Sequence, residues 1–195
     1  MSSNYAQRQP AKRLFASELE ESEYQFKEKD EERAPNYLLL PSGDKANRVM
    51  MGGTLMSVED VSSDDNDNPF WNARINDGTG EFRAFAGQYN PKAASVLQSI
   101  AADESMPPAY VIVIGKTKEY RPEDDESEIL MNIQAETVAV VDEQQRNNWL
   151  KETVEHTLNR LEEDKGEYVL QADERHGDRA ALFKSDLREV LERLE

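Results

Sequence analysis

Alternating apolar and polar residues on either side of a glycine-rich turn form the most informative pattern in this chain. The turn is Asn-Asp-Gly-Thr-Gly at residues 76–80, where glycine can adopt positive φ angles without Cβ strain. Side chains alternate between the two faces of a strand, so Arg83 and Phe85 share the face opposite Phe82. Residues 70–86 therefore predict a tight β-hairpin whose exposed face carries a cation beside an aromatic ring.

The wider pattern predicts five strands and one helix within residues 48–141. The expected strands cover residues 48–58, 70–76, 81–86, 110–120 and 129–141. Between the third and fourth strands, residues 91–100 begin with proline and carry apolar residues at helical spacing, which predicts a helix. This order is that of the OB-fold, a mainly β, five-stranded Greek-key barrel that binds nucleic acid across its second and third strands. An SH3-like barrel is the nearest alternative, but it has no comparable helix before its fourth strand.

Residues 1–47 form an N-terminal extension ahead of the expected barrel. A narrow apolar stripe predicts a short helix near residues 11–21. A charged run at residues 28–33 follows it. Residues 37–40 are then Tyr-Leu-Leu-Leu closed by Pro-Ser-Gly, and we expect an extended segment that docks on the main domain.

Residues 142–163 predict an amphipathic helix after the barrel, with Asp142 as N-cap and Gln145 in the capping-box position. Its apolar stripe consists of Trp149, Leu150, Val154, Leu158 and Leu161. The barrel has an interior of its own and covers only part of such a helix, so we expect this stripe to bind a partner protein. The remaining residues, 164–195, predict a polar linker and a terminal amphipathic helix near residues 183–194. Packing of the stripe on the barrel or on that terminal helix is the alternative.

Composition adds a strong acidic bias to this picture. The 195 residues include 40 acidic and 23 basic side chains, with a mean hydropathy of -0.82 and no cysteine. Disorder, mimicry of nucleic acid and adaptation to a very salty cytoplasm each produce such a balance. We favour the third, because the acidic residues lie outside well-patterned elements. Without cysteine, disulfides and zinc fingers are excluded. No apolar run is long enough to span a membrane and the start of the chain lacks a signal-peptide core, so we expect a cytoplasmic protein.

Charge is distributed unevenly within the expected barrel. Its acidic residues gather in two loops, 59–67 and 123–128, whereas its basic residues lie mostly on strands. Cations hold phosphates and aromatic rings stack on bases, so a basic groove with exposed rings is suited to single-stranded nucleic acid. The residues that we expect to contact nucleic acid are Arg74, Arg83, Phe85, Tyr89, Lys116, Lys118 and Tyr120.

Several of these residues also have a purely structural interpretation. Cations on barrel strands often serve only solubility, and Tyr89 can cap the core instead of stacking on a base. Phe70 is either an exposed platform or a seal at the mouth of the barrel. Trp71 shares a strand face with Ala73 and Ile75, so we expect it in the core.

Other chemistry is weakly represented. Residues 64–68, Asp-Asp-Asn-Asp-Asn, look like a calcium loop but lack the glycine and distal glutamate of the EF-hand at their spacing, so we expect no metal site. His156 and His176 lie in the helical tail, away from any catalytic constellation, and we expect them at the surface. No Walker motif, dinucleotide fingerprint or serine elbow occurs. The sequence thus predicts neither an enzyme nor a cofactor, and no small-molecule substrate.

Six short motifs together resemble the replication protein A-associated OB-fold proteins of haloarchaea. They lie at residues 13–18, 34–43, 47–49, 53–55, 76–80 and 86–89. The resemblance implies a companion of the archaeal replication protein A large subunit that acts on single-stranded DNA in replication and repair. It also implies similarity to the middle subunit of the eukaryotic heterotrimer, whose C-terminal helix joins an intersubunit bundle.

The same resemblance bears on particular residues. It implies that Arg83 is the arginine of the third strand that contacts phosphate or base. Single-strand-binding OB domains place a stacking aromatic at the end of that strand, where this chain has Gly87, so Phe85 or Tyr89 would have to substitute. Residues 164–195 are too short for the winged-helix domain of the eukaryotic middle subunit.

Two function classes remain open from the sequence. The first is a non-enzymatic subunit that binds single-stranded DNA together with the large subunit. The second is a pure interaction module whose groove is covered by the segment at residues 37–40 and whose partner makes all DNA contacts. An RNA-binding cold-shock-like protein is a third interpretation, but the paired strand aromatics of that class are missing.

Overall fold

Five long strands form the centre of the protein in the computed structural model, which describes residues 9–31, 34–62, 68–106, 108–121, 129–162, 166–177 and 179–192. The strands are β5 (Arg48–Asp60), β6 (Trp71–Asn76), β7 (Glu81–Ala86), β8 (Ala109–Tyr120) and β9 (Leu130–Val141). Because β5 pairs with both β6 and β8, the sheet closes into a barrel in the order β5-β6-β7-β9-β8. The β7–β9 pair is parallel and the other pairs within the barrel are antiparallel. The expected OB-fold is confirmed.

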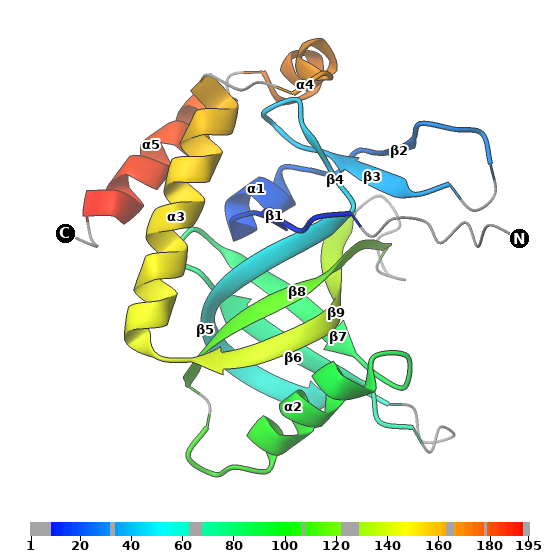
Figure 1. Cartoon of the computed structure of the whole chain (residues 1–195), viewed down its shortest axis with the longest axis vertical. Helices are drawn as coiled ribbons and strands as arrows, with labels where there is room; N and C mark the ends of the chain where they lie inside the picture. The colour runs from blue at the N-terminus through cyan, green and yellow to red at the C-terminus, as the bar shows by residue number, and fades with distance from the viewer. Residues whose placement is uncertain are drawn as a thin grey trace, which may run out of the picture.

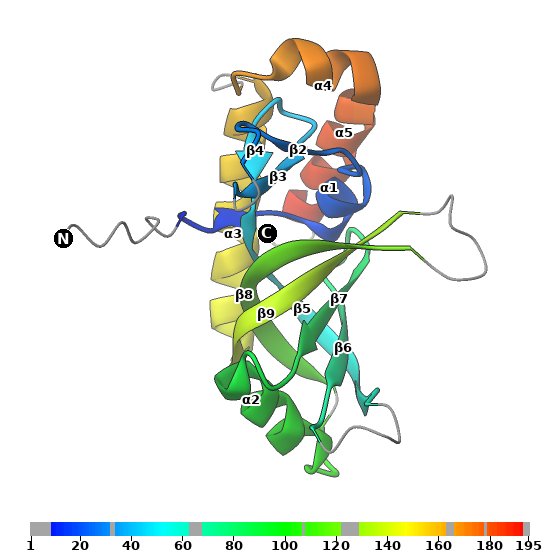
Figure 2. The same cartoon turned by 90° about the vertical axis from the view of Figure 1, so that its right-hand side faces the viewer.

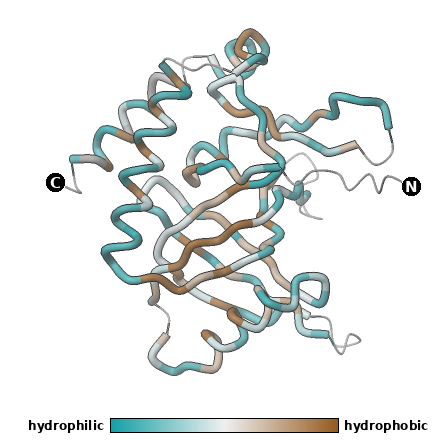
Figure 3. The backbone as a smooth tube through the Cα atoms, viewed as in Figure 1, coloured by the Kyte–Doolittle hydropathy of each residue, from teal (hydrophilic) through white to brown (hydrophobic). Residues whose placement is uncertain are grey.

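Helix α2 (Pro91–Ala101) lies at one end of the barrel, and helices α1, α4 and α5 lie at the other end (Figure 2). Its Leu97 and Ile100 join the barrel core, where Met51, Ile75 and Ile133 are fully buried. Hydrophobic residues follow the barrel strands in Figure 3. The hairpin predicted at residues 70–86 is present as β6 and β7, and Gly78 in its turn has a φ of 94°.

The N-terminal extension adds small elements beside the barrel. They are β1 (Lys12–Arg13), α1 (Ala16–Glu20), β2 (Gln25–Lys27), β3 (Asn36–Leu39) and β4 (Lys45–Ala46). The helix expected at residues 11–21 begins only at Ala16, because β1 pairs in parallel with β5 and the backbone of Phe15 is extended. Strands β2, β3 and β4 form a separate antiparallel sheet, from which Leu38 contributes to the core of the barrel.

Three helices follow the barrel: α3 (Glu143–Glu162), α4 (Val169–His176) and α5 (Arg179–Glu192). The predicted capping box begins α3, since the backbone N–H of Gln145 donates to Asp142 and that of Asp142 donates to Gln145. Helix α4 lies within the segment expected to be a linker. Its start is tied to the turn before β4, where the backbone N–H of Tyr168 donates to the Gly43 carbonyl. In Figure 1, α5 runs beside α3.

Two buried carboxylates fix α1 between the hairpin turn and α3. Asp77, in the turn, accepts a 2.6 Å hydrogen bond from the backbone N–H of Ala16. Glu18, on α1, is completely buried and accepts hydrogen bonds of 3.0 and 3.1 Å from the Arg160 guanidinium on α3. Burial raises the pKa of both carboxyl groups, and the neighbouring donors oppose this shift. The short helix therefore depends on charged partners that are far away in the sequence.

No helix among the described residues is long and apolar enough to cross a lipid bilayer.

Replacing Arg160 by Met is expected to destabilise the fold by about 3 to 5 kcal/mol, because Glu18 remains buried without its counter-charge. Loss of Arg160 also removes an influence that lowers the pKa of Glu18, so its folded pKa rises further. The stabilising contribution of Glu18 is then fully present at pH values below its ordinary pKa of 4.5. It is lost as the pH rises through the pKa of Glu18 in the folded protein. Urea unfolding at about pH 5 and about pH 8 should show a larger deficit at the higher pH.

The double variant Glu18→Gln with Arg160→Met is the control, because it removes both charges. It should recover most of the lost free energy of unfolding and show no added pH dependence. An equal deficit of the single variant at both pH values would contradict this account of the Glu18–Arg160 pair.

Candidate nucleic-acid interface

An open groove of about 700 Å³ crosses the outer face of β6, β7 and β9. Its walls come from the loops that follow β5 and β7 and from the meeting ends of β8 and β9. The side chains that bear on its chemistry are Phe70, Asn72, Arg83, Phe85, Tyr89, Lys118, Tyr120, Asn132 and Gln134. The hairpin pattern predicted this surface, since the outward positions of β7 form its floor.

Two stacked phenylalanine rings form a platform in the groove. The ring centroids of Phe70 and Phe85 are 5.6 Å apart, and their planes differ by 16°. Phe70 is 42% exposed, so it is a platform and not a seal over the core. Because the exposed Phe70 ring lies in the groove, the pair provides the kind of surface on which a nucleobase stacks.

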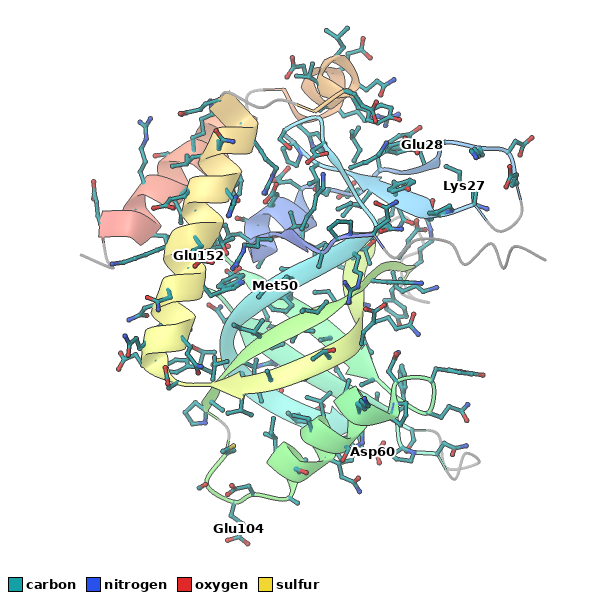
Figure 4. The ribbon with its side chains drawn as sticks, viewed as in Figure 1. Lys27, Glu28, Met50, Asp60, Glu104 and Glu152 are labelled. Carbon is teal, nitrogen blue, oxygen red and sulfur yellow. The ribbon has the colours of Figure 1, made fainter. Side chains whose placement is uncertain are left out.

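Asp60 at the end of β5, labelled in Figure 4, holds Phe70 in place. Its carboxylate accepts hydrogen bonds from the backbone N–H groups of Phe70 and Ser62, and the Val61 N–H donates to the Phe70 carbonyl at 2.8 Å. Hydrogen bonds from Ser62 and then Phe70 lower the pKa of the Asp60 carboxyl group. The carboxylate therefore stays charged at neutral pH and anchors both ends of this loop.

Gly87 makes room for the Phe70 ring. A Cβ atom at position 87 would lie 2.8 Å from Cδ2 of Phe70, closer than real Cβ contacts. The resemblance noted above implies an aromatic residue at this position, whereas here the ring packed against position 87 comes from Phe70. Sequence analysis considered only Phe85 and Tyr89 as substitutes.

The predicted cations divide into two groups. Arg83 and Lys118 line the groove. Arg74 lies opposite Arg83 across the hairpin but outside the groove lining, with its Nε 3.4 Å from Glu81. Lys116 is also outside that lining, in register with Arg48 and Gln134. Two of the four predicted cations thus line the groove.

The predicted tyrosines both line the groove and are exposed. Tyr89 is 83% exposed and Tyr120 is 51% exposed. Tyr89 therefore does not cap the core. Trp71, in contrast, is 9% exposed and belongs to the barrel core, as its strand face predicted.

Three carboxamides on the strands of the groove were not predicted from the sequence: Asn72, Asn132 and Gln134. Asn72 shares a strand face with Phe70 and Arg74, which was the available signal, because alternation places it on the outward side. The polar residues that neighbour a ring across the sheet become apparent only from the strand register.

The apolar stripe of α3 is covered within the chain, contrary to expectation. Trp149, Leu150, Val154 and Leu161 are buried, and partly buried Leu158 packs in the same cluster. That cluster includes Phe15 and, from α5, Phe183, Leu187 and Val190. Met50 of β5, labelled beside α3 in Figure 4, and Ile112 of β8 complete the contact. The argument that the stripe lies open for a partner is therefore wrong, because the barrel, Phe15 and α5 bury it.

No group of three or more metal-ligating side chains occurs in the part of the chain that the structure describes. The acidic segments expected as solvated loops, including residues 64–67 and 123–128, lie outside the described residues, as do Leu194 and the rest of the C-terminus. His156 is exposed, whereas His176 is 7% exposed on α4, so its expected surface position is wrong.

No protein-family model and no curated protein matches this sequence. A chain of a replication protein A heterotrimer bound to single-stranded DNA is similar in structure, with a TM-score of 0.50 at 14% identity over 78% of this chain and 98% of that one. The second single-stranded DNA-binding protein of Mycobacterium smegmatis matches with a TM-score of 0.38 at 10% identity, over 49% of this chain and 87% of that protein. A single-stranded DNA-binding domain from Synechococcus sp. gives 0.35 at 14%, over 48% and 93%. The likeness to the heterotrimer chain supports the OB-fold assignment.

Val154→Asp is expected to lower the free energy of unfolding by at least about 3 kcal/mol, because it puts an unpaired charge into a fully buried site between α3 and its neighbours. Thermal and urea unfolding measure the loss. Asn159→Asp adds the same charge at an exposed position of α3 and should leave stability nearly unchanged. Equal stability of both variants would mean that the stripe is open in solution.

Proposed function

We propose that this protein binds single-stranded DNA in the groove and acts as an accessory subunit of an archaeal replication protein A complex in replication and repair. The stacked Phe70–Phe85 pair beside Arg83 is the observation that carries the DNA-binding part. Rings supply stacking for bases, and Arg83 and Lys118 supply charge for phosphates. The same combination on an OB-fold barrel is the established means of binding single strands.

The acidic composition decides which of these contacts matters most. A net charge of -17 repels DNA in dilute solution, but a cytoplasm of molar salt shortens the Debye length to about 3 Å. Phosphate contacts then contribute little and stacking contributes most of the affinity. Exposed rings in the groove suit such a medium better than a strongly basic surface would.

The groove also favours direct DNA contact over the pure interaction module. That alternative requires the segment at residues 37–40 to cover the groove. In the structure these residues are buried in the N-terminal part of the fold, and none of them lines the groove. The described part of the chain therefore gives no support for a groove covered by residues 37–40, which the interaction module requires.

The complex-subunit part of the proposal rests on the sequence resemblance and on the likeness to a chain of a heterotrimer. The helical end of the chain remains the proposed contact with the large subunit. Since the barrel, Phe15 and α5 bury the α3 stripe, binding through Trp149, Leu150, Val154, Leu158 and Leu161 requires α3 to separate from these neighbours.

Replacing both Arg83 and Phe85 by Ala should weaken binding of oligo(dT) by about tenfold or more, because stacking alone is worth roughly 1 to 3 kcal/mol per base. Fluorescence anisotropy at the native salt concentration measures the affinity. Arg74→Ala is the matched control, since it removes a cation outside the groove lining and should change affinity less than twofold. Unchanged affinity of a folded double variant would favour the interaction module.

Purification of the tagged chain from its host at native salt should recover the replication protein A large subunit in stoichiometric amount. The chain alone and the recovered complex are then each tested for oligonucleotide binding. If the large subunit is recovered but only the complex binds the oligonucleotide, the subunit role stands and DNA binding by this chain alone is refuted. Binding by the chain without any recovered subunit would refute the accessory role and leave a free-standing single-strand-binding protein.

A further inference from the structure

A row of side chains across the barrel places the Phe85 ring between two carboxamides. On one side, Phe85 is in register with Asn72 of β6, and on the other with Gln134 of β9. All three residues line the groove. Phe70, two residues before Asn72 on the same side of the chain, supplies the second ring of the stacked pair. Asn72 is thus bordered by both rings of the platform.

The side chain of Asn72 is buried without a hydrogen-bond partner for its oxygen. The residue is 9% exposed, and its Oδ1 atom finds no donor within the described part of the chain. Phe85 offers no donor, and the neighbour on the other side, Glu59 of β5, has a carboxylate that only accepts. An unpaired buried amide oxygen destabilises the fold. Because Asn72 lines the groove, a donor that arrives with the ligand can supply the missing hydrogen bond.

We propose that Asn72 determines base preference, by accepting a hydrogen bond from the exocyclic amine of a base stacked on the Phe70–Phe85 pair. The inference rests on the proposed function and specifies how that groove selects its ligand. Single-stranded bases have free Watson–Crick edges, and asparagine and glutamine carboxamides are standard partners of those edges. The contact we assign is at position 4 of a pyrimidine or position 6 of a purine, where cytosine and adenine carry an amine and uracil, thymine and guanine carry a carbonyl oxygen. Cytosine and adenine are therefore the preferred bases.

Cytosine and uracil test this hydrogen bond. Both are pyrimidines of the same shape. At position 4 cytosine has an amine and uracil a carbonyl oxygen, and at N3 cytosine has an acceptor and uracil an N–H group. A carbonyl oxygen opposite Oδ1 sets two acceptors against each other, whereas an amine completes the bond. Stacking on the rings is tolerant of the base, so it should contribute almost equally to both.

The test compares oligo(dC) and oligo(dU) of equal length by fluorescence anisotropy at the native salt concentration. The protein should bind oligo(dC) about fivefold more tightly than oligo(dU), the value of one neutral hydrogen bond. Asn72→Leu should reduce this ratio to about one while oligo(dU) affinity changes less than twofold. Asn132→Ala is the matched control, because Asn132 lines the groove two residues from Gln134 and faces Lys118 instead of a ring. Its ratio should stay near that of the unaltered protein.

Thermal unfolding supplies a readout that does not depend on binding. Asn72→Leu removes the unpaired buried oxygen and keeps the volume, so its melting temperature should equal or exceed that of the unaltered protein. An unchanged ratio in a folded Asn72→Leu variant would overturn the inference. A ratio near one in the unaltered protein would overturn it too. In both cases, binding of the oligonucleotides would still uphold the proposed function. Loss of the ratio in Asn132→Ala as well would overturn the assignment to Asn72. Absence of binding to either oligonucleotide would refute both proposals.

Discussion

Pairing of β5 with both β6 and β8 is the constraint on which the rest of this structure depends. It closes the sheet, so every strand must send one set of side chains inward and the other set outward. The inward set, with Met51, Ile75 and Ile133, fills the barrel. The outward set on β6, β7 and β9 then forms an ordered row that contains Asn72, Phe85 and Gln134. The chemistry of the groove thus follows from closure and register together.

The same closure leaves the ends of the chain to be held by other means. Apolar packing against Met50 and Ile112 holds α3, and α5 covers the remaining side of the α3 stripe. The short helix α1 buries Ala16 and Leu19 in the hydrophobic core and is also held by Asp77 and Glu18. These flanking parts and the barrel therefore stabilise each other.

Periodicity predicted the barrel strands, α2 and α3 to within two residues of their ends, because each contains enough residues for its apolar spacing to be unambiguous. It was less successful where a tertiary contact decides local structure. Residues 12–13 pair with β5 and thereby shorten the helix expected around them. Helix α4 is polar and depends on contacts with the turn at Gly43, which no local pattern reveals. In the groove, alternation identified Arg83 and Phe85, but the role of Asn72 depends on what lies beside it in the neighbouring strands.

The packing of Phe70 against Gly87 has a consequence for how this groove varies among related chains. With the Phe70 ring where it lies here, position 87 cannot carry a side chain, because a Cβ atom there would lie 2.8 Å from Cδ2 of that ring. A relative with an aromatic residue at the end of β7 should therefore have a small residue, or a different loop path, where this chain has Phe70. The ring at this place in the groove then comes either from position 70 or from position 87. Substitutions at the two positions should therefore occur in pairs among related chains.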